Sequence, residues 1–143
     1  MTKSYWLMKS EPDVYSWDEL VAEGEGTWDG VRNHAAKLHL QAMKKGDEAF
    51  FHHSNTGLEV VGIMAISVPG LKDPKDGSGK WAAVKVQPLR KLARRVTLKE
   101  IKANPVLKGM EMLRQSRLSV APVRAEEWAE IVAMSKSQPA GTG

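Results

Sequence analysis

The sequence predicts one α+β domain, in which a small mixed sheet or β-barrel is flanked by short helices. Two observations predict this class. Short apolar stretches with strand-like patterns fill the middle of the chain, and helical patterns with capping signals lie towards both ends. With 143 residues, the chain has single-domain length. We expect the domain to span residues 1–135 and segment 136–143 to be a disordered tail.

The first third of the chain contains a strand and two helices. Residues 5–8 form a short apolar run that is typical of a buried strand. Ser16 and Glu19 have the Ser-x-x-Glu form of a capping box, which predicts a short helix that stops at Gly24. A second helix is predicted over residues 33–45, because apolar residues share one face and a glycine follows.

The middle of the chain is rich in strands. Residues 48–53 and 59–68 predict two strands, and the polar segment 54–57 between them predicts a hairpin. The second strand is almost wholly apolar, so it should be central and covered on both faces. Residues 69–80 contain many Gly, Pro, Asp and Lys residues and predict a flexible surface loop. Residues 81–87 predict a further strand.

The last third of the chain returns to helices. Thr97 opens a second capping box, and an Asn-Pro pair at residues 104–105 closes the short helix that it starts. Residues 110–115 can be helical or irregular, and residues 118–120 predict a last short strand. Residues 124–134 predict a final helix with an apolar face towards the core.

Composition limits the function classes. The net charge is +4 with a pI near 9.4, which favours a polyanionic partner such as nucleic acid. The absence of cysteine excludes disulfides and thiolate metal sites. No apolar run approaches the ~20 residues of a spanning helix, and the first residues lack the apolar region of a signal peptide. We therefore expect a monomeric cytoplasmic protein without a membrane segment.

Catalysis is weakly supported by the sequence. His53 and Ser54 could serve a hydrolase, but Ser54 lacks the Gly-x-Ser-x-Gly turn that exposes a hydrolase nucleophile. Adjacent strand residues such as His52 and His53 point to opposite faces, so only one of them can face a pocket. The alternative interpretation is one outward histidine and one that is hydrogen-bonded near the surface. The histidines lack metal-ligand spacing and no nucleotide-cofactor motif occurs, so we expect neither a metal nor a cofactor.

The most informative polar segment is residues 28–33 (Trp-Asp-Gly-Val-Arg-Asn). Trp28 offers a flat face for a base, and Gly30 lets a backbone approach a ligand closely. Arg32 could hold a phosphate or carboxylate, and Asn33 could both donate to and accept from a base edge. An alternative stays open, in which Asn33 only caps a helix and Trp28 belongs to the core.

Two further groups of basic residues could contact a nucleic-acid backbone. Arg114 and Arg117 lie beside a short predicted strand, where they could equally form a solvated edge. A basic stripe could supply sequence-independent affinity for phosphates, or it could be an ordinary solvated face. The residues of this stripe are Arg90, Lys91, Arg94 and Arg95.

Four blocks in order resemble the EVE-domain family of the PUA-like superfamily. They are residues 6–12, 28–33, 51–54 and 114–120, and the resemblance runs from Trp6 to about Met134. It implies a PUA-like β-barrel flanked by helices, similar in fold to YTH domains, which hold a methylated adenine in an aromatic cage. It also implies a non-catalytic reader of a modified nucleobase, with modified cytosine in DNA favoured. RNA binding is the alternative, because many PUA-like domains bind RNA.

The resemblance also implies roles for individual residues. Trp28 falls where a cage wall is expected, and Asn33 falls where a contact to a base edge is expected. The remaining residues of the predicted pocket or its rim are Lys9, Ser10, Gly30, Arg32, His53, Ser54, Arg114, Arg117 and Ser119.

Two positions depart from the family pattern. His52 stands where many relatives have Tyr, which predicts a different ligand preference or a pH dependence near the ~6.5 pKa of histidine. Arg124 stands where a capping Ser or Thr is expected, which predicts a less firm start to the last helix.

Overall fold

A computed structural model describes residues 3–10, 14–54, 58–115 and 118–136, and it confirms the α+β class. Within these residues, six strands form one mixed sheet with the order β2-β5-β4-β3-β1-β6. Only the β1–β3 pair is parallel among the neighbouring strands. The strands are β1 (Tyr5–Ser10), β2 (Gly26–Trp28), β3 (Glu48–His53), β4 (Glu59–Lys72), β5 (Ala82–Thr97) and β6 (Val120–Val123).

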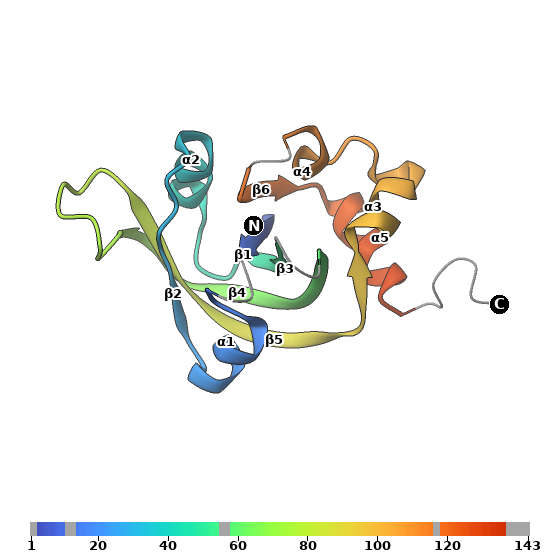
Figure 1. The fold of residues 1–143 in the computed structure, drawn as a ribbon, viewed down its shortest axis with the longest axis horizontal. Coiled ribbons are helices and arrows are strands. Elements are labelled where there is room, and N and C mark those ends of the chain that lie inside the picture. The colour runs from blue at the N-terminus through green and yellow to red at the C-terminus, as the bar shows by residue number, and fades with distance from the viewer. Residues whose placement is uncertain (1–2, 11–13, 55–57, 116–117, 137–143) are drawn as a thin grey trace.

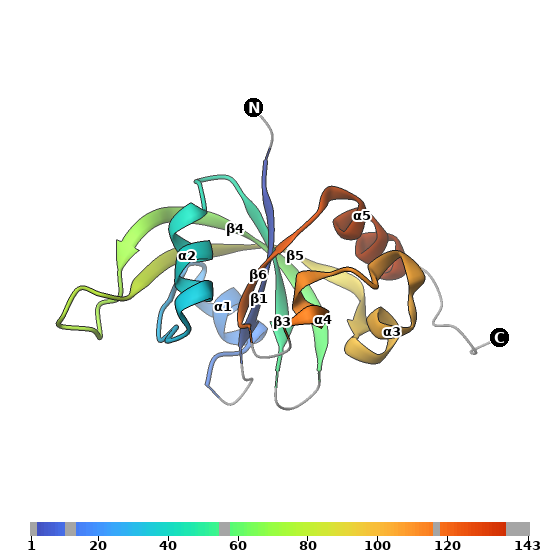
Figure 2. The same ribbon diagram turned by 90° about the horizontal axis from the view of Figure 1, so that it is seen from above.

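Helices surround this curved sheet (Figure 1). Helix α2 contacts both β6 and β5, so it spans the opening between the two ends of the sheet. Helices α3, α4 and α5 gather at one end of the molecule, and the loop between β4 and β5 projects from the other (Figure 2). The helices are α1 (Trp17–Glu23), α2 (His34–Ala42), α3 (Leu98–Ala103), the 3-10 turn η1 (Pro105–Leu107), α4 (Glu111–Arg114) and α5 (Ala125–Met134). Among the described residues, no helix has both the length and the apolar character to cross a bilayer.

Strand β3 supplies the core on both faces of the sheet. Its neighbouring residues Phe50 and Phe51 are fully buried and point to opposite sides, as strand geometry requires. Phe50 stacks on Trp128 with ring centroids 3.9 Å apart. Phe51 meets the edges of Trp17 and Trp28 at 5.6 and 5.3 Å. The aromatic cluster around Phe51 is the floor on which the candidate site is built.

Helix α1 is seated on the sheet by a glycine. The predicted capping box is present, since Ser16 and Glu19 bond each other's backbone amides at 3.1 Å. This cap starts the helix with the Trp17 ring directed at β4. A Cβ atom on Gly62 would lie only 2.6 Å from that ring, so β4 needs a glycine where the indole crosses it. Only this close approach lets Trp17 be 4% exposed.

The long β4–β5 hairpin corrects two predicted boundaries. Residues 69–72 continue β4 although they were predicted as loop, and β5 continues to Thr97 rather than ending at Gln87. Pro69 and Pro88 fall in this ladder because the register of the pair shifts at several bulges, where a missing amide donor is tolerated. The basic stripe therefore lies on a strand.

Other boundaries differ by a few residues. Helix α2 ends at Ala42 rather than residue 45, because the buried Asp47 carboxylate accepts the Lys44 amide at 3.0 Å and closes a turn there. Strand β2 was not predicted, since three residues are too few to show an alternating pattern. The last strand is Val120–Val123 rather than residues 118–120.

The start of α5 is firmer than its N-cap residue predicts. The Arg124 amide donates to the Glu127 carboxylate at 2.8 Å, and the Arg124 guanidinium donates to the same carboxylate at 3.0 Å. Glu127 therefore satisfies the first turn from inside the helix, and the missing Ser or Thr is compensated.

Candidate functional site

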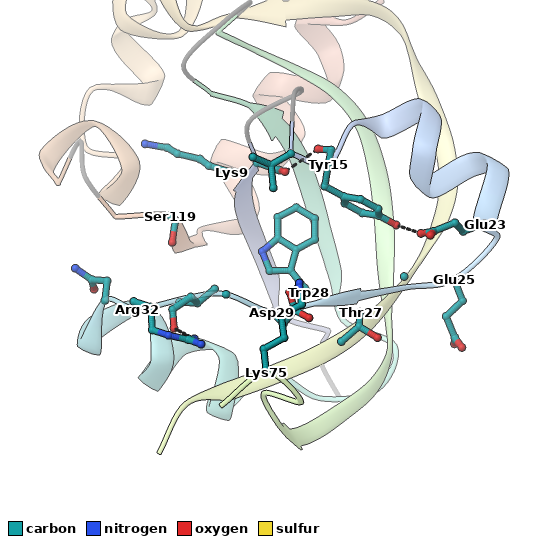
Figure 3. Close-up of a pocket in the computed structure, with 16 residues that line it drawn as sticks. Lys9, Tyr15, Glu23, Glu25, Thr27, Trp28, Asp29, Arg32, Lys75 and Ser119 are labelled. Carbon is teal, nitrogen blue, oxygen red and sulfur yellow. Dashed lines mark hydrogen bonds and ion pairs between the residues drawn. The ribbon is translucent and has the colours of Figure 1, made fainter. Parts of the chain in front are cut away.

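A cavity of about 770 Å³ opens beside β2 (Figure 3). Its walls are the end of β1, residues 14–15 before α1, the end of α1, strand β2 with Glu25 before it, and the segment that joins β2 to α2. Lys75 and Ser119 complete the lining. This volume lies in the range that proteins use for small organic ligands. Seven of the predicted site residues line it, namely Lys9, Ser10, Trp28, Gly30, Arg32, Asn33 and Ser119.

Trp28 belongs to the core and to the cavity wall at once. It is 6% exposed, and its ring meets Phe51 at 5.3 Å and Tyr15 at 6.3 Å, both edge to face. Figure 3 shows the remaining part of the indole turned into the cavity. The two interpretations of this residue are therefore compatible, because burial on one side holds the ring still while the other side lines the space.

Tyr15 supplies a second aromatic wall that the sequence did not indicate. Its ring is at 84° to Trp28, and its hydroxyl donates to the Glu23 carboxylate at 2.5 Å. Burial and the neighbouring Glu23 carboxylate raise the pKa of Tyr15, so the phenol stays protonated. The rings of Trp28 and Tyr15 are nearly perpendicular, so a flat ligand could stack on one ring while its edge faces the other.

A buried carboxylate organises the segment that follows Trp28. The Asp73 side chain is 0% exposed and accepts hydrogen bonds from the Gly30 amide and the Arg32 guanidinium, both at 2.8 Å, and from the Lys75 amide at 2.7 Å. Burial raises the pKa of this carboxyl, but the three hydrogen bonds outweigh burial and the pKa is lowered overall. Arg32 thus holds a carboxylate of the protein itself.

Gly30 is needed for its backbone angle. Its φ is +77°, and a Cβ atom there would meet nothing within 4 Å. This left-handed turn aims the Gly30 amide at Asp73, and close approach to a ligand stays a prediction for this cavity-lining residue.

Asn33 caps α2 and keeps a hydrogen-bond donor towards solvent. Its Oδ1 accepts the Ala36 amide at 3.0 Å, as the capping interpretation predicted. The cap uses one lone pair of Oδ1 and neither of the Nδ2 hydrogens, so donation to a base edge, as expected from the sequence, is compatible with the cap. The cap and a contact to a ligand can therefore coexist, with Asn33 acting as a donor.

Lys9 and Ser10 come from the end of β1. Burial lowers the pKa of Lys9, and in Figure 3 its ammonium group points away from the Trp28 ring. The Ser10 hydroxyl donates to the Tyr15 carbonyl at 2.7 Å, which ties the end of β1 to the second aromatic wall.

Three of the predicted site residues that the structure describes are not brought to the cavity. His53 and Ser54 do not line it, and the His53 Nε2 accepts the Trp17 amide at 3.3 Å. This bond gives His53 a structural role at the start of α1 and leaves the hydrolase alternative without support. Arg114 lies in an ion pair with Glu111 at 3.4 Å. Arg117 lies outside the described residues.

His52 is neither outward nor hydrogen-bonded. It is 1% exposed, and neither ring nitrogen has a hydrogen-bond partner among the described residues. Burial, helped by the nearby Lys9 charge, lowers the pKa of His52 to about 4. The predicted pH dependence near 6.5 is therefore wrong for this side chain in the folded protein, which holds it neutral.

The basic stripe does not line the cavity and is partly neutralised. Arg94 pairs with Glu100 and Arg95 pairs with Glu59, each at 2.8 Å. Ser10 at the cavity is in register with His53, and His53 is in register with Glu59, the partner of Arg95.

The family model described as EVE domain matches residues 4–134. The chain belongs to the EVE domain family. Mouse thymocyte nuclear protein 1 is 35% identical, and the match covers 95% of this chain and 75% of that protein. A solution structure from Rhodopseudomonas palustris is 47% identical with a TM-score of 0.88, covering 98% of both chains. The crystal structure of human THYN1 protein in complex with 5-methylcytosine-containing DNA is 33% identical with a TM-score of 0.89, covering 96% of this chain and all of that chain.

The expected likeness to YTH domains is confirmed at the level of fold. The YTH domain of Zygosaccharomyces rouxii MRB1, solved with N6-methyladenosine RNA, aligns over 99% of this EVE domain and 92% of its own chain with a TM-score of 0.61. At 16% identity this likeness is one of fold alone.

Proposed function

We propose that this EVE domain is a non-catalytic reader of a modified base in nucleic acid, with 5-methylcytosine in DNA as the favoured ligand. The observation that carries the proposal is Trp28, whose ring is held by Phe51 and Tyr15 and lines a cavity of about 770 Å³. The human THYN1 structure with 5-methylcytosine-containing DNA supports the choice of base.

A held ring suits the energetics of base recognition. Extruding a base from a duplex costs a few kcal/mol, and stacking on an aromatic side chain returns about 1–3 kcal/mol. Trp28 loses no side-chain freedom on binding, since its packing against Phe51 already fixes it. The ring therefore needs no ordering before a base contacts it.

The donor on Asn33 favours bases that present an acceptor. Its Oδ1 accepts the Ala36 amide, and its Nδ2 hydrogens are not used by the cap, so Asn33 can donate to an acceptor in the cavity. Cytosine presents N3 as an acceptor on its pairing edge, whereas thymine and uracil present an N–H donor at that place. We expect a cytosine to be accepted there and a thymine to be disfavoured.

Fluorescence anisotropy with labelled duplexes tests the proposal. The duplexes differ only in one 5-methylcytosine or cytosine, and a matched RNA provides a third arm. We expect the methylated DNA to bind more tightly, and Trp28→Phe, which keeps a ring in the core, to retain the preference. Trp28→Ala should lose about 1–3 kcal/mol of binding. Because this variant also removes core volume, its folding is checked by thermal unfolding.

Asn33→Asp provides the second variant. Aspartate can still cap α2, but it has no hydrogens to donate, so affinity should fall while thermal stability is kept. Equal affinity for methylated and unmethylated DNA would overturn the proposed ligand. A clear preference for the RNA arm would move the protein to the RNA-binding alternative.

A further inference from the structure

Three cationic side chains surround Trp81 at the end of the β4–β5 loop. The Lys80 ammonium lies 5.1 Å from its ring centroid, the Arg32 guanidinium 5.5 Å and the Lys37 ammonium 5.9 Å. We call these four residues the Trp81 cluster. They come from separate parts of the chain, since Arg32 precedes α2, Lys37 is in α2, and Lys80 and Trp81 precede β5.

We propose that the Trp81 cluster binds the phosphates of the nucleic-acid strand that leads out of the Trp28 cavity. This inference rests on the proposed function, and it assigns the backbone contacts that the basic stripe was expected to make.

The charges of the cluster are incompletely balanced by the protein. Arg32 pairs with Asp73, but among the described residues no carboxylate lies within 4.0 Å of the Lys37 or Lys80 ammonium groups. Contact with an aromatic face is worth about 0.5–1 kcal/mol at an exposed site, and it leaves the N–H donors of both lysines unused. Cations gathered around one ring repel each other, and an anion between them removes that repulsion.

Arg32 connects the cluster to the cavity, because it both lines the cavity and contacts Trp81. The opposite rim is acidic, and Figure 3 shows Glu23 and Glu25 on the far side of Trp28 from Arg32. A polyanion is repelled along the acidic rim and attracted along the Arg32 rim. A strand whose base enters the cavity is therefore directed over the Trp81 cluster.

The loop that presents the cluster is internally braced. The Asp76 carboxylate accepts the Trp81 amide at 2.8 Å and the Ser78 hydroxyl at 2.7 Å. These hydrogen bonds lower the pKa of Asp76 to about 2, so the brace stays ionised at neutral pH. The backbone that carries Trp81 is thus fixed before any ligand arrives, which reduces the entropy cost of binding.

The salt dependence of DNA binding by the full chain tests the inference. Lys37→Gln with Lys80→Gln removes two charges from the cluster. The matched control is Lys99→Gln with Lys102→Gln on α3, which removes two charges from exposed positions at the other end of the molecule. The slope of log affinity against log salt should fall by about 0.7–0.9 for each cluster lysine. The control should keep the wild-type slope, and both variants should keep the preference for the methylated duplex.

The two proposals fail in different ways. A cluster variant with an unchanged slope, or a control with an equal loss, overturns the phosphate assignment even where the methylated duplex is preferred. If the salt slope instead falls in Arg90→Gln with Lys91→Gln, the phosphate contacts belong to the basic stripe and the assignment to the Trp81 cluster is overturned. A third result separates the proposals: the methylated and unmethylated duplexes bind equally, and only the cluster variant lowers the salt slope. This result overturns the modified base as ligand and supports the phosphate contacts.

Discussion

Replacing Asp73 with alanine removes the one buried carboxylate that holds the cavity wall together. The Gly30 and Lys75 amides and the Arg32 guanidinium all lose their acceptor. Each backbone amide costs about 1 kcal/mol when it loses its hydrogen bond. The Arg32 side chain is 43% exposed, so solvent screening limits its ion pair to at most about 1 kcal/mol. We expect the free energy of unfolding to fall by about 3 kcal/mol in total.

Urea unfolding followed by circular dichroism measures this change, which corresponds to a Tm about 10 °C lower for a domain of this size. The matched control is Asp76→Ala, because Asp76 bonds residues of its own turn and should affect the cavity less. Amide hydrogen exchange at Gly30 should accelerate in Asp73→Ala and stay near wild type in Asp76→Ala. A loss below about 1 kcal/mol in Asp73→Ala, or equal acceleration of exchange at Gly30 in both variants, would refute the role assigned to Asp73.

Two other predictions concern packing around the site. Burial, and to a smaller extent the Lys9 charge, lower the pKa of His52 from 6.5 to about 4 in the folded protein. Between these two pH values the unfolded chain binds a proton at His52 and the folded protein does not. The free energy of unfolding should fall by about 3 kcal/mol across that window, and His52→Phe should show a smaller fall. Urea unfolding at several pH values measures both proteins. Parallel curves of unfolding free energy against pH for the two proteins would contradict the prediction. Gly62→Ala forces a methyl group towards the Trp17 ring and should cost about 1–3 kcal/mol in urea unfolding. Gly77→Ala, where a Cβ meets nothing within 4 Å, is its control, and similar losses in the two variants would disprove the steric argument.

The elements that the sequence predicted well are those with local signals. The capping boxes at Ser16 and Thr97 start α1 and α3, because a cap depends on residues three positions apart. The β4–β5 pair was harder, since Pro88 and the charges after it read as a strand end. The structure tolerates them at register shifts, which depend on the partner strand and leave no local pattern.

The candidate site shows the same division. Residues 28–33 stood out because their side chains suit ligand contacts, and the structure places them along one cavity. Their organiser, Asp73, lies 43 residues from Gly30 in a loop that the sequence marked only as polar. Tyr15 stood alone in its segment and gave no signal. The contact between Asp73 and Gly30 depends on how the β4–β5 hairpin places its loop beside the end of β2. No short sequence motif indicates such a placement.

Trp28 belongs both to the hydrophobic core and to the cavity wall, and this limits how the shape of the pocket can change. Moving the indole means moving Phe51, and Phe51 neighbours Phe50, which anchors the layer against Trp128. A ligand of the wrong outline therefore meets a wall that cannot yield without loosening both halves of the hydrophobic interior. We expect the pocket to gain specificity mainly by excluding ligands that do not fit. We expect substitutions that let it bind further ligands to lower its thermal stability as well.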